Sequence, residues 1–188
     1  MTERLIIKKS VKEDIKYIEQ IYEESIAWLN QKGIHQWKTG VYPTPQTALN
    51  AFMEGSLYSC FACDTLAGTF VINEKQLPHY AALGWKYTGG KVLVLHTLAV
   101  KPDQTGKGIG KAIVQYVEGY ARQNAYDAIR LDAFPDNTAA IVLYKGFGFE
   151  YVGKILFEIK EPGYEWFDCY EKCTRAQKEK TGCPKPGF

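Results

Sequence analysis

The sequence has no N-terminal apolar segment of the kind that directs secretion, and its apolar runs are short. Val92–Val100 is one such run, but His96 interrupts it, and a membrane-spanning helix needs about 20 predominantly apolar residues. Charge of one sign is not concentrated anywhere, because 23 basic and 21 acidic residues are interspersed and leave a formal charge of +2. We therefore expect a cytoplasmic protein that binds neither a membrane nor nucleic acid.

Cysteine is scarce and odd in number, with five residues in a chain of 188, which argues against a disulfide framework. Two pairs, Cys60/Cys63 and Cys169/Cys173, are close enough in sequence to raise the question of zinc. Their neighbours suggest strands, where residues three apart point to opposite faces and residues four apart lie about 13 Å from each other. Neither pair could then hold one ion at a bond length of about 2.3 Å, so we expect buried thiols and no metal site.

Internal repeats and low-complexity segments are absent as well. Hydrophobic residues make up 46% and charged residues 23% of the chain, which is typical of a globular protein with one well-buried core. We expect a single domain over residues 1–173. Residues 174–188 contain Lys, Pro and Gly without periodicity, which predicts a loosely ordered C-terminal tail.

What the sequence does contain is one organising stretch, Val92–Asn124, with the pattern of a strand, a short glycine loop and a long amphipathic helix. The loop runs Gly106-Lys107-Gly108-Ile109-Gly110, and residues without Cβ let the backbone approach a ligand closely. Free N–H groups and the helix dipole favour an anion at a helix start, so the loop predicts a phosphate-binding site. The apolar residues that follow recur on one helical face: Ile109, Ala112, Ile113, Tyr116, Val117, Tyr120 and Ala121.

The spacing of this loop excludes the two common nucleotide motifs. A Walker loop requires a glycine where Lys101 stands and a Ser or Thr where Gly108 stands. The dinucleotide fingerprint requires its third glycine at the position of Lys111. The phosphate ligand must therefore be of another kind.

The stretch resembles the central motif of the Gcn5-related N-acetyltransferase (GNAT) family. That motif is a strand ending Leu-Ala-Val, a proline turn and a Q/R-x-x-G-x-G/A loop, matched without gaps by Leu98-Ala99-Val100, Pro102 and Thr105–Gly110. Thr105 is a departure, since the family usually has Gln or Arg there. A second family motif appears as Asn137-x-x-Ala140-x-x-Leu143-Tyr144-x-x-Gly146-Phe147, and the resemblance covers Leu5–Glu171.

The remaining pattern agrees with the fold that this resemblance implies. Periodic segments with start and stop residues predict helices after Ser10 as far as Gly33, over Gln46–Met53 and from Asp136 to Gly146. We expect an α/β fold with a mixed, partly parallel central sheet of about seven strands and helices on both faces. The expected strands are Arg4–Lys9, Tyr58–Cys63, Thr69–Asn73, Val92–Val100, Ala128–Ala133, Tyr151–Glu158 and Glu165–Glu171.

The resemblance implies transfer of an acetyl group from acetyl-CoA to a primary amine, by direct attack on the thioester without a covalent enzyme intermediate. The pantetheine arm would pair with the backbone of Leu98, Ala99 and Val100. The pyrophosphate would lie over Thr105, Gly106, Lys107, Gly108, Ile109 and Gly110. Lys107 and Lys111 could add positive charge or could simply be solvated, and Asn137 could contact the cofactor, cap a helix, or both.

Two residues are candidates for proton transfer. Tyr144 occupies the position of the family's general acid, which protonates the leaving thiolate, although a Tyr on an amphipathic helix also suits a core. His96 lies two residues before Leu98 and would share its strand face beside the acyl group. An imidazole with an ordinary pKa of about 6.5 suits a base. The alternatives are a hydrogen-bonded core histidine, with a carboxylate or a water chain as the base.

Two aromatic segments without predicted secondary structure, Ile34–Pro45 and Gln76–Thr88, are candidates for the walls of an acceptor site. The aromatic candidates are Trp37 and Tyr42 in the first segment and Tyr80 and Trp85 in the second. Ring faces suit a small-molecule amine with an apolar or aromatic portion, and packing on the protein's own core is the alternative. The pattern also leaves open a protein-lysine or N-terminal acetyltransferase, a non-catalytic acyl-CoA sensor, and assembly as a homodimer.

Overall fold

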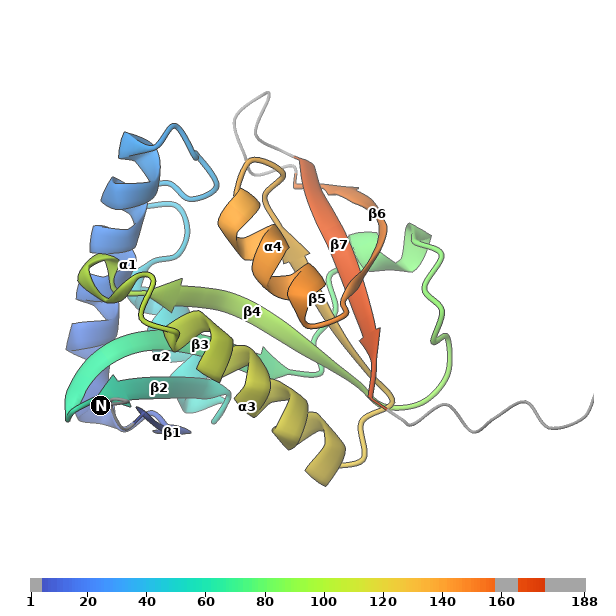
Figure 1. Cartoon of the computed structure of the whole chain (residues 1–188), viewed down its shortest axis with the longest axis horizontal. Helices are drawn as coiled ribbons and strands as arrows, with labels where there is room; N and C mark the ends of the chain where they lie inside the picture. Colours follow the sequence, from blue (N-terminus) through green and yellow to red (C-terminus); the bar gives the residue numbers. More distant parts are fainter. Residues whose placement is uncertain (1–4, 158–165, 175–188) are drawn as a thin grey trace, which may run out of the picture.

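The structure is a computed structural model that describes residues 5–157 and 166–174. Within these ranges the strands form one sheet in the order β1-β2-β3-β4-β5-β7-β6, and Figure 1 shows the helices around it. The strands are β1 (Leu5–Lys9), β2 (Leu57–Ala62), β3 (Thr65–Asn73), β4 (Val92–Val100), β5 (Ala128–Ala133), β6 (Glu150–Leu156) and β7 (Trp166–Cys173). The helices are α1 (Ile15–Gln31), α2 (Pro45–Met53), α3 (Ile109–Gln123) and α4 (Thr138–Gly146), with 3-10 turns η1 (Lys12–Asp14), η2 (Pro78–Ala82) and η3 (Pro102–Gln104).

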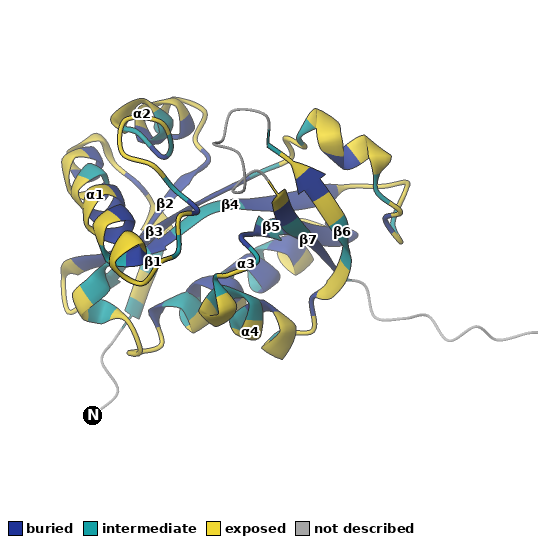
Figure 2. Cartoon of the chain, turned by 90° about the horizontal axis from the view of Figure 1, so that it is seen from above, coloured by how far each residue is buried: buried dark blue, intermediate teal, exposed yellow. Residues whose placement is uncertain are grey.

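The sheet is mixed because one of its pairings is parallel. β4 and β5, which are joined through α3, run parallel, whereas the other neighbouring strands pair antiparallel. α1 and α2 cover one face of the sheet, and α3 and α4 cover the other, as the view in Figure 2 shows. The fold class expected from the sequence is thereby confirmed.

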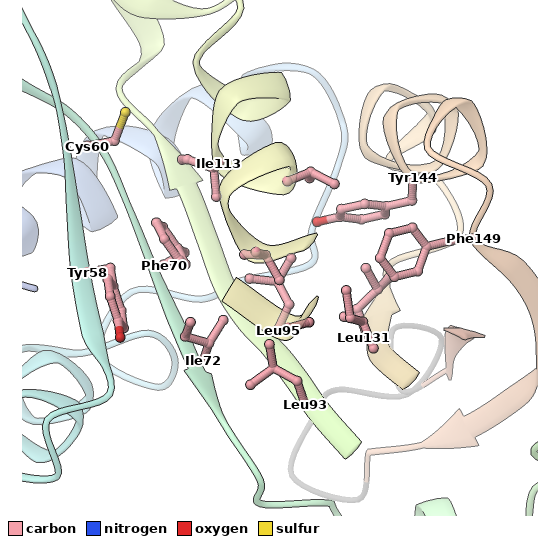
Figure 3. Packing of buried hydrophobic residues seen from close by; sticks show 14 of the residues in the cluster. Tyr58, Cys60, Phe70, Ile72, Leu93, Leu95, Ile113, Leu131, Tyr144 and Phe149 are labelled. Atoms are coloured by element: carbon pink, nitrogen blue, oxygen red, sulfur yellow. The ribbon is translucent and has the colours of Figure 1, made fainter. Parts of the chain in front are cut away.

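Two apolar layers hold the helices to the sheet. On one face, Ile113 of α3 packs in a cluster with Leu93 and Leu95 of β4, which Figure 3 shows from close by. On the other face, Ile18 of α1 belongs to a cluster with Val71 of β3 and Ala99 of β4. β4 is therefore covered on both sides, which explains why its sequence is a continuous apolar run and not an alternating one.

The hairpin between β2 and β3 is tighter than the sequence pattern predicts. Its turn consists of Cys63 and Asp64, with left-handed φ values of 45° and 65°, the backbone of a two-residue turn that matches strand twist. Gly68 therefore lies inside β3 and not in the turn. A Cβ there would lie 3.0 Å from the Ala99 carbonyl oxygen and 3.1 Å from Ile109 Cγ2, so glycine allows the start of α3 to approach the sheet.

β4 and β5 part near their carboxyl ends. Their last paired residues are Leu95 and Leu131. Just beyond this point β4 carries a bulge at Thr97, whose φ is 47°. Between His96 and Ala99 the bulge adds one residue to β4 relative to β3, which turns the strand locally and shifts its alternation. The opening between the parted strands is where the candidate site lies.

Some expected boundaries differ from the structure. The segment Gln76–Thr88 has a secondary structure of its own, because Pro78–Ala82 forms the 3-10 turn η2. Thr174 is still tied to the sheet, since its N–H donates to the Asp127 carbonyl oxygen at 3.0 Å. The predicted strand ends at Glu158 and Glu165 and the remainder of the predicted tail lie outside the described residues. In the described ranges, none of the helices has both the length and the hydropathy needed to cross a bilayer.

Candidate functional site

A cavity of about 780 Å³ opens where β4 and β5 part. Residues 95–100 of β4 and Asp132 and Ala133 of β5 line it. The loop before α3, the first turns of α4, the connection from α1 to α2 and η2 also contribute to its lining. One continuous cavity therefore joins the predicted phosphate loop, the parted strands and part of the predicted aromatic walls.

The loop before α3 has the backbone geometry of an anion cradle. Gly106 and Gly108 have φ values of 82° and 84°, which glycine adopts without strain, and a Cβ on either would meet no atom within 4 Å. Gly108 is the N-cap of α3 and makes no side-chain cap. The Ala112 N–H donates to the Gly108 carbonyl oxygen at 2.9 Å. The N–H groups of residues 109–111 precede that bond, so they can receive an anion at the positive end of the helix.

The charged and small residues of this loop have different roles. Lys111 lines the cavity, whereas Lys107 does not. The Lys107 ammonium is exposed and donates to Gln104 Oε1 at 3.2 Å. Gly110 packs closely against α4, because a Cβ there would lie 3.2 Å from Leu143 Cδ2. Lys111 therefore stays a candidate for contact with a phosphate, whereas Lys107 has the solvated position that the sequence also allowed.

The end of β4 presents an unpaired edge to the cavity. Leu98, Ala99, Val100 and Thr105 all line the cavity, and among the described strands β5 does not pair with β4 beyond Leu95. Backbone groups on that side of β4 can hydrogen-bond an extended ligand arm, as a neighbouring strand would. The structure thus brings the predicted strand edge and the predicted phosphate loop to the same cavity.

Asn137 caps α4 and also joins two distant segments. Its Oδ1 accepts from the Ala140 N–H at 3.2 Å, and its Nδ2 donates to Gln36 Oε1 at 2.7 Å. Gln36 comes from the connection between α1 and α2, and both Asn137 and Gln36 line the cavity. The helix-cap interpretation of Asn137 is therefore what its contacts support, and the bond to Gln36 has no signal in the sequence.

Tyr144 lies on α4 and lines the cavity, although its side chain is only 7% exposed. Its ring packs edge-on against Phe149, with the ring centroids 5.9 Å apart. Figure 3 labels both side chains. Burial raises the pKa of its hydroxyl well above the ordinary tyrosine value, and the negative charge of Asp132 raises it further. The hydroxyl is therefore protonated at neutral pH and is able to donate a proton.

His96 also lines the cavity, but it does not share a face with Leu98 as the sequence predicts. The extra residue in the bulge leaves Leu98 in the cluster that faces α3, while His96 follows Val94 on the opposite face. Its Nε2 hydrogen-bonds Asn73 Oδ1 at 3.1 Å. Burial lowers the pKa of the imidazole to about 4, although a hydrogen bond with the Lys75 backbone opposes this shift. The ring is therefore neutral at pH 7.

The first aromatic segment does form a wall of the cavity. Trp37 and Tyr42 both line it, as does Trp28 from α1. The Tyr42 hydroxyl is hydrogen-bonded to Thr97 Oγ1 in the bulge of β4. Burial raises the pKa of Tyr42 to about 12, and the charge of Asp132 acts in the same direction, whereas the bond to Thr97 opposes it.

The second aromatic segment corrects the sequence prediction. Tyr80 and Trp85 are 1% and 8% exposed and are not among the residues that line the cavity. The Tyr80 hydroxyl donates to Asp132 Oδ2 at 2.8 Å, and the Trp85 indole N–H donates to the Tyr80 carbonyl oxygen at 2.7 Å. The Trp85 ring also stacks on the guanidinium of Arg130, 4.1 Å from the ring centroid. Both aromatic residues therefore hold the segment on the core, which was the alternative, and do not face an acceptor.

Other residues of the cavity were missed in the sequence. Leu77, Pro78 and His79 of the second segment line it in place of Tyr80 and Trp85. Asp132 also lines it, and an acidic residue inside a short apolar strand is a signal that could have been noticed, because burying a charge is costly. The ring residues Phe134, Phe157 and Phe167 complete the apolar lining, and nothing in their local pattern sets them apart from core residues.

A comparison with family models supplies the identity of this fold. The model described as the acetyltransferase (GNAT) family matches residues 18–149. The chain belongs to the GNAT acetyltransferase family. The matched range contains the glycine cradle, the parted strands and Tyr144, so the family predicted from the two sequence motifs is confirmed.

The curated relatives of this GNAT chain match it over limited lengths. N-acetyltransferase 8B from Rattus norvegicus is 37% identical over 67 residues, which are 36% of this chain and 30% of that protein. An uncharacterized protein from Mycobacterium leprae is 30% identical over 122 residues, which are 63% of this chain and 30% of that protein. The chain thus spans about 30% of the length of these relatives.

Solved structures share the GNAT fold with this chain over most of its length. A GNAT-family acetyltransferase from Streptococcus agalactiae superposes with a TM-score of 0.78 at 20% identity, over 92% of this chain and 96% of that chain. A putative acetyltransferase from Salmonella typhimurium, described with its cofactor acetyl-CoA, has a TM-score of 0.64 at 14% identity, over 95% of this chain and 99% of that chain. At such identities the likeness shows the fold.

The glycine cradle predicts a selective effect of Gly108→Ala on CoA binding. A methyl group there would enter the space that the phosphates need, so affinity for CoA, measured by calorimetry, should fall about tenfold or more. Gly148→Ala is the matched control, because Gly148 has a similar φ of 77° and also meets no atom within 4 Å. Both variants should lose similar stability from backbone strain. Equal CoA affinities in the two variants would contradict phosphate binding at the glycine cradle.

Proposed function

We propose that this GNAT-family chain transfers an acetyl group from acetyl-CoA to the primary amine of a small molecule. The observation that carries the proposal is the continuous cavity of about 780 Å³ that joins the glycine cradle to an aromatic wall through the opening between β4 and β5. A donor bound along the cradle and an amine bound at the aromatic wall would meet beside Tyr144 and His96.

Positioning is the first task of the cavity residues. When bound, acetyl-CoA supplies a thioester that an amine can attack directly. The N–H groups at the start of α3 and the free edge of β4 hold the donor, and the walls hold the amine. Holding two reactants in line is worth an effective concentration of about 10⁵–10⁸ M, which makes a nucleophilic side chain unnecessary.

Tyr144 is proposed to protonate the leaving thiolate. As the amine nitrogen bonds to the acetyl carbon, the bond from that carbon to sulfur breaks and leaves a thiolate. The Tyr144 hydroxyl then donates its proton to the sulfur. Burial and the charge of Asp132 raise the pKa of the hydroxyl, which keeps it protonated but also makes it a weak acid. Its place in the cavity lining is therefore what supports this role.

An amine that arrives as an ammonium first loses one proton to solvent, because only the neutral nitrogen can attack the thioester. His96 is proposed to accept the second proton, which the nitrogen loses as the amide forms. The low pKa of the imidazole keeps the ring in its neutral, proton-accepting form at pH 7, but also makes it a weak base. Its bond to Asn73 Oδ1 fixes the ring at the β3 side of the opening. If the His96 ring does not face the amine, a carboxylate or a water chain would act as the base instead.

The cavity walls favour a small amine with an apolar portion. Trp28, Trp37, Phe134 and Phe167 are among the residues that line the cavity, and aromatic rings bury apolar surface and attract an ammonium. Among the described residues that line the cavity, Asp132 is the sole acidic one. This lining supports a small molecule over a basic protein tail, for which several carboxylates would be expected.

Replacement of Tyr144 tests the proposed function. In a steady-state assay of CoA thiol release with a panel of amines, Tyr144→Phe should lower kcat roughly 10²–10⁴-fold with little change in CoA affinity. Tyr170→Phe, at a tyrosine that is 1% exposed and outside the cavity lining, is the control. Absence of amine-dependent thiol release in the wild-type protein would favour a non-catalytic acyl-CoA sensor.

The pH dependence of kcat tests the base. Because the pKa of His96 is lowered to about 4, the ring is neutral above that value and becomes protonated as the pH falls through it. At saturating amine, kcat should therefore stay level through pH 6.5 and fall only as the pH approaches about 4. His96→Gln should lower kcat and remove this acidic limb. A limb that survives unchanged in His96→Gln places the base elsewhere.

Truncation of a tryptophan side chain to alanine should have different effects in the two aromatic segments. Trp37→Ala removes a ring from the cavity wall, so it should raise the KM of the amine several-fold while CoA affinity is kept. Trp85→Ala removes a buried ring, so it should lower the free energy of unfolding by about 3–5 kcal/mol. Trp166→Ala, at an exposed tryptophan outside the cavity lining, should change neither. An unaltered KM in Trp37→Ala for every accepted amine would contradict the proposal that the first aromatic segment contacts the amine.

A further inference from the structure

We propose that Asp132 binds the ammonium group of the acceptor and restricts the acceptor to an alkylamine without a carboxylate beside the amine. This inference rests on the proposed function, because it names the substrate class of the same site. It depends on four observations: the place of Asp132 in the sheet, the groups around it, the way in which it is held, and the charges in the cavity.

Asp132 lies at the point where the strands separate. It directly follows Leu131, which pairs with Leu95 as the last pair between β4 and β5. The next residue of β4 is His96, and both His96 and Asp132 line the cavity. The carboxylate therefore belongs to the part of the opening where the two strands no longer touch and where an acceptor has room.

Asp132 also lies within electrostatic reach of both sides of the cavity. Its charge raises the pKa of Tyr144 on α4 and the pKa of Tyr42 in the connection between α1 and α2. These two hydroxyl groups come from opposite faces of the sheet, and both residues line the cavity. A cation bound at Asp132 is thus close to the proposed general acid and to the aromatic wall.

Tyr80 fixes the orientation of this carboxylate. The Tyr80 hydroxyl donates to Asp132 Oδ2 at 2.8 Å, and Tyr80 is itself held by the indole N–H of Trp85. A carboxylate has about four lone-pair sites, so the bond to Tyr80 is compatible with a second donor. Tyr80 is therefore a positioning residue that acts on the acceptor through Asp132.

The charges in the cavity set the substrate class. Among the described residues that line it, Asp132 is the sole carboxylate, Lys111 is the sole lysine, and there is no arginine. Lys111 belongs to the first turn of α3, at the phosphate cradle. An ammonium that leaves water needs an anionic partner, which Asp132 supplies. A carboxylate beside the amine would be repelled by Asp132, and the described lining offers it no arginine and no lysine other than Lys111 of the cradle.

Binding measurements on the CoA-saturated protein test the inference without requiring turnover. The probes are 2-phenylethylamine, which is protonated at pH 7, and 2-phenylethanol, which has the same apolar body without the charge. By calorimetry, Asp132→Asn should raise the Kd of the amine roughly 10- to 100-fold. The Kd of the alcohol should change by less than about twofold. An equal loss for both probes, or no binding of the amine to the wild-type protein, overturns the inference.

Three further comparisons separate charge from structure. Asp136→Asn removes an exposed carboxylate before α4 that does not line the cavity, and it should leave both Kd values unchanged. Tyr80→Phe keeps the charge of Asp132 but removes its hydrogen bond, so it should raise the Kd of the amine about three- to tenfold. This variant decides the case if Asp132→Asn does not fold, since an unchanged amine affinity there overturns the inference.

The third comparison uses phenylalanine, which carries a carboxylate beside the amine. It should bind the wild-type protein at least about tenfold more weakly than 2-phenylethylamine, and equal affinity overturns the proposed substrate class. A failure of the proposed function is distinguishable from these outcomes. Absence of acetyl transfer to every amine contradicts the function, whereas selective loss of amine binding in Asp132→Asn still supports the ammonium site.

Discussion

The parting of β4 from β5 is the constraint on which the rest of this structure depends. Parallel pairing ends at Leu95 and Leu131, and the bulge at Thr97 turns β4 away just beyond that pair. A strand edge without a neighbour is costly in a buried sheet unless something else satisfies its hydrogen bonds. Here the edge lines a cavity, where an extended ligand arm can take the place of the missing strand.

The site is held open by contacts between segments that are far apart in the sequence. On one side Gln36 accepts from Asn137 and Tyr42 is bonded to Thr97. These bonds fix the connection between α1 and α2 above the opening. They join this connection to α4 and to β4, so they help to define the shape of the cavity there.

On the other side, β5 holds the segment that carries η2. Arg130 and Asp132 alternate onto one face of this strand. The Arg130 guanidinium bonds Glu171 at 2.9 Å, stacks on Trp85 and donates to the Tyr87 carbonyl oxygen. Such a buried charge is stable only with its partners in place. The same strand therefore positions a wall of the cavity and presents a carboxylate to it.

The sequence by itself determined the family, the order of strands and helices and the glycine loop before α3. These features are local, because helix periodicity, strand patterning and the left-handed glycines Gly106 and Gly108 act over a few residues. Only the tertiary structure decided which faces the side chains take. One inserted residue at Thr97 reverses the alternation and moves His96 away from the face of Leu98. Burial of aromatic segments and the exposure of Asp132 to the cavity depend on long-range packing, which no local pattern encodes.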